Sequence, residues 1–193
     1  GLERAFGWDR WDQAYLEALA KTGNEPIGSL GYDGPLAALN PEKPNLSEFF
    51  KETVAVVTNP AIDREREVEH FSTRTLLGRR PLPDGRGGGR VEELLLPIVL
   101  EEDQALAEAF GTLTLSEVRA RFKTKTLVPQ FTVEEGLLAG LKRLEEEAVK
   151  AVEEGAEVLI LSDREAFQGG VWIDVGLAVA AVNRALMKRD AEG

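Results

Sequence analysis

The segment that decides the fold is EEGLLAGLKRLEEEAVKAVEEGAEVLIL, residues 134–161. Its leucines and alanines recur every three or four residues, which places them on one side of a helix. Gly155 follows the last of these positions, where glycine commonly ends a helix. The uniformly apolar residues 158–161 are typical of a buried strand. We therefore expect a helix over residues 133–154, followed directly by a strand.

The flanking residues extend this pattern into a larger unit. Alternating side chains before the helix indicate a strand, formed by Phe122, Thr124, Thr126 and Val128. A final helix is expected over residues 174–188, with four side chains facing inward: Val175, Val179, Val182 and Leu186. The order strand, helix, strand, helix favours a right-handed parallel βαβ unit. The predicted fold class is α/β, a three-layer-like sheet with at least one such unit in the C-terminal third.

The N-terminal part indicates helices separated by a long loop. Asp9 can cap a helix that Gly23 ends. Residues 24–44 are rich in glycine and proline, which favours a long ordered loop. Asn45 can start another helix that must stop before Thr58-Asn59-Pro60, and Asp63 can cap a second, short one.

The middle of the chain combines short apolar runs with a glycine-rich segment. A strand is expected over residues 71–77 and a helical pattern over residues 101–110. Between them, PLPDGRGGGR at residues 81–90 is predicted to be a flexible loop. Its glycines and arginines would suit a phosphate-binding loop, but such a loop follows a strand and opens a helix, so we favour a surface loop. Residues 1–193 are expected to form a single domain.

Composition excludes several classes of function. The formal net charge of -11 disfavours nucleic acid and anionic membranes as partners. Because the chain has no cysteine, it cannot form disulfides or supply thiolates to an iron–sulfur cluster. His70 is the only histidine, so a catalytic triad or a histidine metal site lacks partners. No apolar run is long enough to span a membrane and no signal peptide is evident, so we expect a cytoplasmic protein. Abundant Glu, Arg and Leu suggest a thermophilic source.

Ser162-Asp163-Arg164 is the best generic candidate for a ligand pocket, because it follows the strand at residues 158–161 and ligands of open α/β sheets bind at carboxyl ends of strands. A structural role is the alternative that we favour. In that role Ser162 and Asp163 bind backbone amides of the turn, and Arg164 pairs with a carboxylate.

Several motifs, read in chain order, resemble the central domain of glutamate synthase, the enzyme that makes glutamate from glutamine and 2-oxoglutarate. They are RAFGW at residues 4–8, EALAKTGNEPIGSLGYDGPLAAL at 17–39, PNLSEFFKETVAVVTNPAIDREREV at 44–68 and EEGLLAGLKRLEEEAVKAVEEGAEVLILSDR at 134–164. Together they cover well over half of the chain. The most specific are TNPAID, which contains Thr58, Asn59 and Asp63, and ILSDR.

The resemblance implies a non-catalytic domain that joins a glutamine amidotransferase domain to an FMN-binding synthase domain, in the same or in separate chains. FMN and the iron–sulfur cluster would then lie in those other domains, and this chain would hold no cofactor and no metal. Such a domain acts by spacing two active sites and walling an ammonia passage from water. We expect Gly28, Ser29, Gly31 and Asp33 to face the inter-domain region, because glycines allow close backbone approach.

The sequence also departs from the family pattern. After Ser162-Asp163-Arg164 the family usually has a proline-bearing segment and a histidine-rich helix, whereas this chain has FQGGVWIDVGLAVAAVNRALMKR. This difference suggests a divergent or split enzyme. The rival hypothesis is a stand-alone α/β module that binds a small ligand at the carboxyl end of its sheet. A scaffold should expose an apolar surface around Trp8, Trp11 and the loop at residues 28–34, whereas a binding module should enclose a polar pocket beside Arg164.

Overall fold

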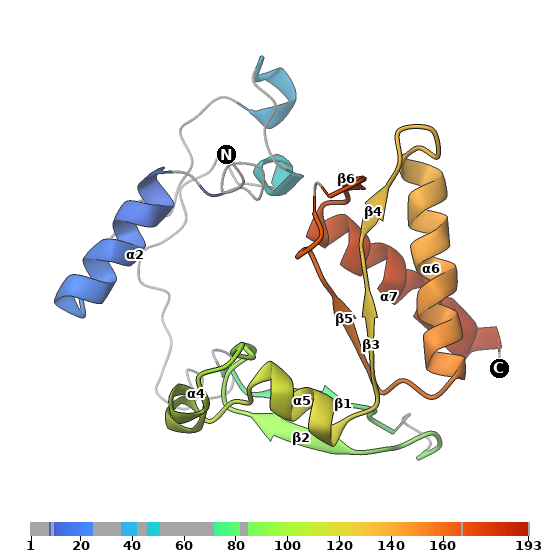
Figure 1. Cartoon of the computed structure of the whole chain (residues 1–193), viewed down its shortest axis with the longest axis horizontal. Coiled ribbons are helices and arrows are strands. Elements are labelled where there is room, and N and C mark those ends of the chain that lie inside the picture. The colour runs from blue at the N-terminus through green and yellow to red at the C-terminus, as the bar shows by residue number, and fades with distance from the viewer. Residues whose placement is uncertain are drawn as a thin grey trace, which may run out of the picture. The chain divides into compact units, whose positions relative to one another are not determined.

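The computed structural model describes residues 8, 10–24, 36–41, 46–50, 72–81, 85–166 and 168–192 (Figure 1). The chain divides into two compact units, Gly1–Ala61 and Ile62–Gly193. The single domain expected over residues 1–193 therefore stays a prediction.

In its described residues, the first unit has one α-helix and two short 3₁₀ helices. Helix α2 spans Arg10–Thr22, and Gly23 follows it with a φ of 68°, a left-handed conformation that glycine adopts without strain. The 3₁₀ helices are η1, Ala37–Leu39, and η2, Leu46–Phe50. The helix expected to begin at Asn45 is a 3₁₀ helix over its described residues. The rest of that expected helix lies outside the described residues.

The first described elements of the second unit form a hairpin. Strand β1, Thr75–Gly78, pairs antiparallel with β2, Val91–Leu94. The glycine-rich segment joins the two strands, and pairing continues into it, because Gly89 N–H donates to the Arg79 carbonyl over 2.9 Å. The segment thus connects two strands rather than a strand and a helix. This position fits the surface loop and not a phosphate-binding loop.

Two short capped helices follow the hairpin. Helix α4, Gln104–Phe110, is capped by the Asp103 carboxylate and ends at Gly111. Helix α5, Leu115–Arg121, starts with a complete capping box between Thr114 and Glu117. Helix α5 was not predicted from the sequence, although Thr114 and Glu117 form the T-x-x-E pattern that starts it.

The C-terminal part contains the predicted parallel unit. Strand β3, Thr124–Leu127, and strand β5, Val158–Leu161, pair in parallel, with Thr124 opposite Val158. Helix α6, Leu137–Glu153, connects them, and helix α7, Val175–Glu192, follows β5. Strands β4, Gln130–Phe131, and β6, Val171–Trp172, form a short antiparallel pair. The α/β class and the parallel βαβ unit are confirmed. Because the described strands form only two-stranded sheets, the wider three-layer arrangement stays a prediction.

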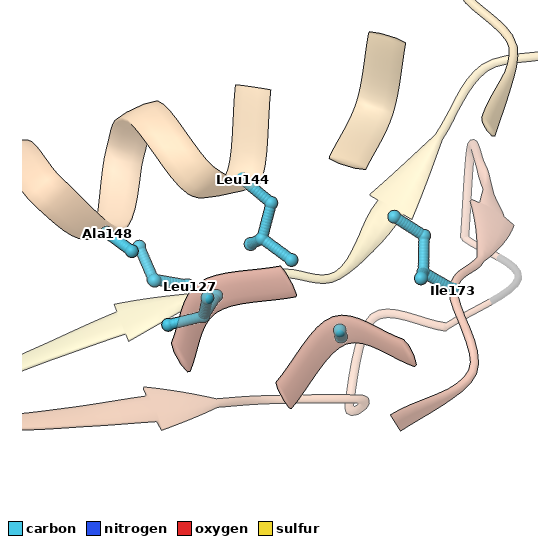
Figure 2. Close-up of a cluster of buried hydrophobic side chains, with 6 residues drawn as sticks. Leu127, Leu144, Ala148 and Ile173 are labelled. Atoms are coloured by element: carbon cyan, nitrogen blue, oxygen red, sulfur yellow. The ribbon is translucent and has the colours of Figure 1, made fainter. Parts of the chain in front are cut away.

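Two hydrophobic clusters form the core of the second compact unit. The larger one lies among β3, β5, α6 and α7, which run side by side in Figure 1. Figure 2 shows Leu144 and Ala148 of α6 pointing toward Leu127 of β3, with Ile173 nearby. The smaller cluster comprises Leu94, Leu113, Val118 and Phe122. Val158 packs against the smaller cluster, while Leu159 and Leu161 pack against the larger one, so β5 contributes to both.

Two sequence expectations are corrected. Helix α6 begins at Leu137 and not at residue 133, because residues 132–136 form a turn in which Glu135 N–H donates to the Thr132 hydroxyl over 3.1 Å. In α7, Val182 is buried as expected, but Val175 and Val179 are 54% and 50% exposed. Helix α7 is apolar on several sides, so periodicity alone could not select its inner face.

Candidate functional site

Most of the predicted site residues lie outside the part of the chain that the structure describes. The inter-domain candidates among them are Gly28, Ser29, Gly31 and Asp33. The motif candidates among them are Thr58, Asn59 and Asp63. Their roles stay predictions. In the first unit, the described side chains of Trp8, Tyr15, Leu16 and Leu19 are each more than 40% exposed.

The structure places Ser162, Asp163 and Arg164 in the turn directly after β5. Ser162 N–H donates to the Leu127 carbonyl over 2.9 Å, which extends the parallel ladder by one bond. The Ser162 hydroxyl accepts a long hydrogen bond from Arg164 N–H, at 3.4 Å. Asp163 accepts from Ala166 N–H through its backbone carbonyl over 2.8 Å. These bonds shape the turn, as the structural alternative predicted for Ser162.

The Arg164 guanidinium forms an ion pair with Glu101, which lies just before α4. Their side chains are 65% and 64% exposed, so water reaches both charges. Such an exposed pair contributes about 0–1 kcal/mol to stability. A hollow of about 290 Å³ lies beside them, lined by Glu101, Glu102, Leu115, Ser116, Arg119 and Arg164. Arg164 thus pairs with a carboxylate, and it does so at an open surface rather than inside a closed pocket.

A charge network links the hairpin to α5. The Glu92 carboxylate accepts hydrogen bonds from Arg90 over 2.8 Å and from Arg121 over 2.7 Å. Burial alone would raise the pKa of Glu92, but these two hydrogen bonds and the positive charges of both arginines lower it below its ordinary value. Arg121 also pairs with Glu117 over 2.8 Å. A hydrogen bond from Thr114 N–H is the main cause that lowers the pKa of Glu117.

A second network fixes α6 to the turn before it and to β4. Arg143 donates to Glu135 over 2.9 Å, to Glu147 over 3.1 Å and to the Gln130 carbonyl over 2.7 Å. The pKa of Arg143 is raised, chiefly by its hydrogen bond to Glu135, and the same bond lowers the pKa of Glu135. Each network therefore joins separate elements through charged hydrogen bonds, which is a structural role.

A hollow of about 1030 Å³ in the second unit was not predicted from the sequence. Arginines 79 and 86 of the hairpin loop line it together with the C-terminal halves of α6 and α7. Its charges are mixed, and Arg184 pairs with Glu145 across the two helices. Among the described residues, no group of three or more His, Cys, Asp or Glu side chains could hold a metal ion. None of the described helices is long and apolar enough to cross a membrane.

The fold and these contacts define an α/β domain whose described charged groups stiffen it and connect its elements. Comparison with known proteins gives the family: the model of the glutamate synthase central domain matches residues 2–192. The chain belongs to this family.

Three relatives illustrate the match. The large chain of NADPH-dependent glutamate synthase from Bacillus subtilis is 34% identical over 191 residues, covering 97% of this chain and 12% of the relative. Ferredoxin-dependent glutamate synthase 2 of Arabidopsis thaliana is 34% identical over 167 residues, covering 84% and 10%. NADH-dependent glutamate synthase of Saccharomyces cerevisiae is 30% identical over 182 residues, covering 90% and 8%. The chain thus spans about an eighth or less of the relatives it matches, and their names carry three different electron donors.

Proposed function

We propose that this chain is the non-catalytic central domain of a glutamate synthase, which connects and spaces the glutamine amidotransferase domain and the FMN-binding synthase domain. The observation that carries the proposal is the family match over residues 2–192, combined with the small share of each relative that the chain spans. Most of the enzyme, including the groups that react, then lies in other domains.

The contacts of the second unit suit a spacing role. A domain that holds two active sites at a fixed distance needs elements that do not slide past one another. The Glu92 network ties the hairpin to α5, and the Arg143 network separately ties α6 to β4, through hydrogen bonds of 2.7–3.1 Å. Bonds that fix several elements at once resist relative movement better than an isolated pair does.

The amino-acid composition of the chain agrees with the proposal that other domains hold the cofactors. Iron–sulfur clusters are bound by cysteine thiolates, and this chain has none, so it cannot supply the usual ligands. FMN and the cluster belong, in this proposal, to the other domains of the assembled enzyme.

The chain's proposed contribution to ammonia transfer lies in the loop with Gly28, Ser29, Gly31 and Asp33. A passage that carries ammonia between two sites must exclude water, or the ammonia escapes into solution. Glycines let two backbones approach closely, and a carboxylate can position a donor of the opposing domain. This loop would then seal the passage at the domain junction.

The test is the coupling between the two half-reactions in the assembled enzyme. Asp33→Asn and Gly31→Ala should leave glutamine hydrolysis intact but lower the glutamate formed per glutamine hydrolysed, with free ammonia making up the difference. Glu146→Gln is the matched control, because Glu146 is an exposed carboxylate on α6. Coupling that is unchanged in both loop variants would remove the passage from the proposal.

A further inference from the structure

The hollow of about 1030 Å³ in the second unit collects positive charge from three elements. The hairpin loop and the C-terminal halves of α6 and α7 line it (Figure 1). We call it the hairpin hollow. Its cationic side chains are Arg79, Arg86, Lys150, Arg184, Lys188 and Arg189. Four carboxylates also line it, so these six cations leave a net charge of +2. Because the whole chain carries -11, the hollow reverses the sign of the protein's charge.

The ends of the two helices account for only part of this positive charge. Basic side chains in the last turn of a helix interact favourably with its dipole, which explains Lys150 in α6 and Arg189 in α7. That explanation does not extend to Arg79 and Arg86, because they belong to the hairpin loop. The convergence of a separate element on the same hollow is a reason to look for a negatively charged ligand.

The hairpin fixes the backbone of Arg79 and leaves room for its side chain. Arg79 N–H donates to the Arg90 carbonyl over 3.1 Å, and the Arg79 carbonyl accepts from Gly89 N–H over 2.9 Å. A Cβ added at Gly89 would lie 3.5 Å from Arg79 Cδ, and one added at Gly87 would lie 3.8 Å from Arg79 Nη2. The Arg79 side chain therefore runs along these glycines, and a hydrogen-bonded backbone holds its base in place.

The carboxylates of the hollow orient its arginines. Glu145 accepts a hydrogen bond from Arg184 over 2.5 Å, and Asp190 accepts one from Arg189 over 3.0 Å. A guanidinium has five N–H donors in a planar fork, so one such bond leaves further donors on each arginine. The hollow can therefore offer donors from several arginines to one anion while their positions are set by the protein.

We propose that the hairpin hollow binds the polyphosphate group of a small ligand. Arginine forks bind phosphate oxygens in pairs, and cations that come from three elements suit a ligand with several charged groups in a row. The volume of the hollow lies at the upper end of the range of about 300–1,000 Å³ for small-molecule sites, so a nucleoside polyphosphate fits it. Val149 and Ala185 add apolar surface to its lining.

This site differs from a phosphate-binding loop, which the position of the glycine-rich segment between two strands disfavours. Its donors are arginine and lysine side chains, not the backbone amides of a loop that opens a helix. Binding here would stand beside the spacing role and does not depend on it.

The test is isothermal titration of the purified 193-residue chain with sodium tripolyphosphate in a phosphate-free buffer. Arg79→Gln removes the guanidinium that the hairpin supplies. Arg74→Gln is the matched control, because Arg74 lies just before β1 in the same hairpin, pairs with Glu93 over 3.0 Å and does not line the hollow. Both variants change the net charge equally. Lys188→Gln on α7 is a second variant should Arg79→Gln fail to fold, and circular dichroism checks the fold of each.

We expect saturable binding of tripolyphosphate to the wild type with a Kd below about 1 mM. Arg79→Gln should weaken it at least about tenfold and Lys188→Gln at least about threefold, because each removes hydrogen bonds between charged groups. Arg74→Gln should weaken it less than about twofold, because salt screens a charge that makes no contact. Absence of saturable binding to the wild type would overturn the proposal. Equal weakening by Arg74→Gln and Arg79→Gln would overturn it too, because only the overall charge would then matter.

Two further probes identify the chemistry of the ligand. Citrate, a tricarboxylate, should bind at least about tenfold more weakly than tripolyphosphate, because it has fewer charged oxygens to reach cations on three elements. Equal affinity for citrate would overturn the assignment to a polyphosphate. ATP without magnesium distinguishes a nucleotide from free polyphosphate. Tighter binding of ATP than of tripolyphosphate supports a nucleotide that also contacts Val149 and Ala185, and equal binding supports a site for the phosphates alone.

Discussion

Replacing Gly140 with alanine should destabilise the protein, although helix propensity alone predicts the reverse. Gly140 lies inside α6 and is buried. A glycine in a helix interior costs about 1 kcal/mol relative to alanine, so the substitution would ordinarily stabilise by that amount. Here an added Cβ would lie 2.5 Å from the Cβ of Phe131 in β4. Carbon atoms normally stay about 3.5–4.0 Å apart, so β4 and α6 must separate.

The magnitude follows from these two opposing terms. Overpacking of a well-packed site costs about 1–3 kcal/mol. The upper half of that range applies, because the Phe131 Cβ is attached directly to the backbone and cannot rotate away. Subtracting the gain of about 1 kcal/mol from propensity leaves a net loss of about 1–2 kcal/mol. For a chain of this length the Tm should fall by roughly 2–8 °C.

The assay is thermal and urea unfolding followed by circular dichroism, with Ala139→Gly as the matched control. Ala139 is the exposed neighbour of Gly140 in the same helix turn, so Ala139→Gly reports propensity without the contact. It should lose about 1 kcal/mol. If Gly140→Ala unfolds at a higher temperature than the wild type, β4 does not lie against α6 as the contact between Gly140 and Phe131 requires.

Three further predictions concern the second unit. Because the pKa of Glu92 is lowered in the folded state, its ionised form stabilises the fold above the ordinary pKa of 4.5, and this contribution is lost as the pH falls through the folded-state pKa. Glu92→Gln should therefore flatten the acid side of a plot of unfolding free energy against pH. An unaltered slope would contradict this. Thr114→Ala removes the capping box of α5 and should cost about 1 kcal/mol by urea unfolding, whereas a loss below about 0.3 kcal/mol would show that the cap does not hold the helix. Gly111 and Gly85 both have positive φ, but only at Gly111 would an added Cβ meet a leucine side chain, at 2.5 Å. Gly111→Ala should therefore lower the Tm more than Gly85→Ala does. Equal losses of Tm would exclude the contact.

The elements with a single clear period were predictable from the sequence. Strand β5 has the expected bounds, and α6 ends one residue before its predicted end, because leucines and alanines on one side and charges on the other leave one way to bury the helix. Helix α7 starts within one residue of its predicted start but continues to Glu192, four residues beyond the predicted end, and the prediction that Val175 and Val179 face inward was wrong. An apolar helix can bury more than one side, and only packing against α6 selects between them.

The contacts that join distant segments could not be predicted. Arg164 pairs with Glu101, 63 positions earlier in the chain, and Arg121 pairs with Glu92 across 29 positions. Nothing local marks which of 34 acidic residues an arginine will meet. The structural role that we favoured for Arg164 did pair it with a carboxylate, but the identity of that partner depends on the fold.

The most direct test of the central claim is an activity and cofactor assay of the purified 193-residue chain. The chain is incubated with glutamine, 2-oxoglutarate and, in turn, NADPH, NADH and reduced ferredoxin, and glutamate and ammonia are quantified. The absorbance spectrum of the protein reports any bound flavin. We expect no glutamate or ammonia above the rate without protein, and no flavin absorbance. Turnover of glutamine by the chain alone, or a flavin that stays bound through gel filtration, would contradict it.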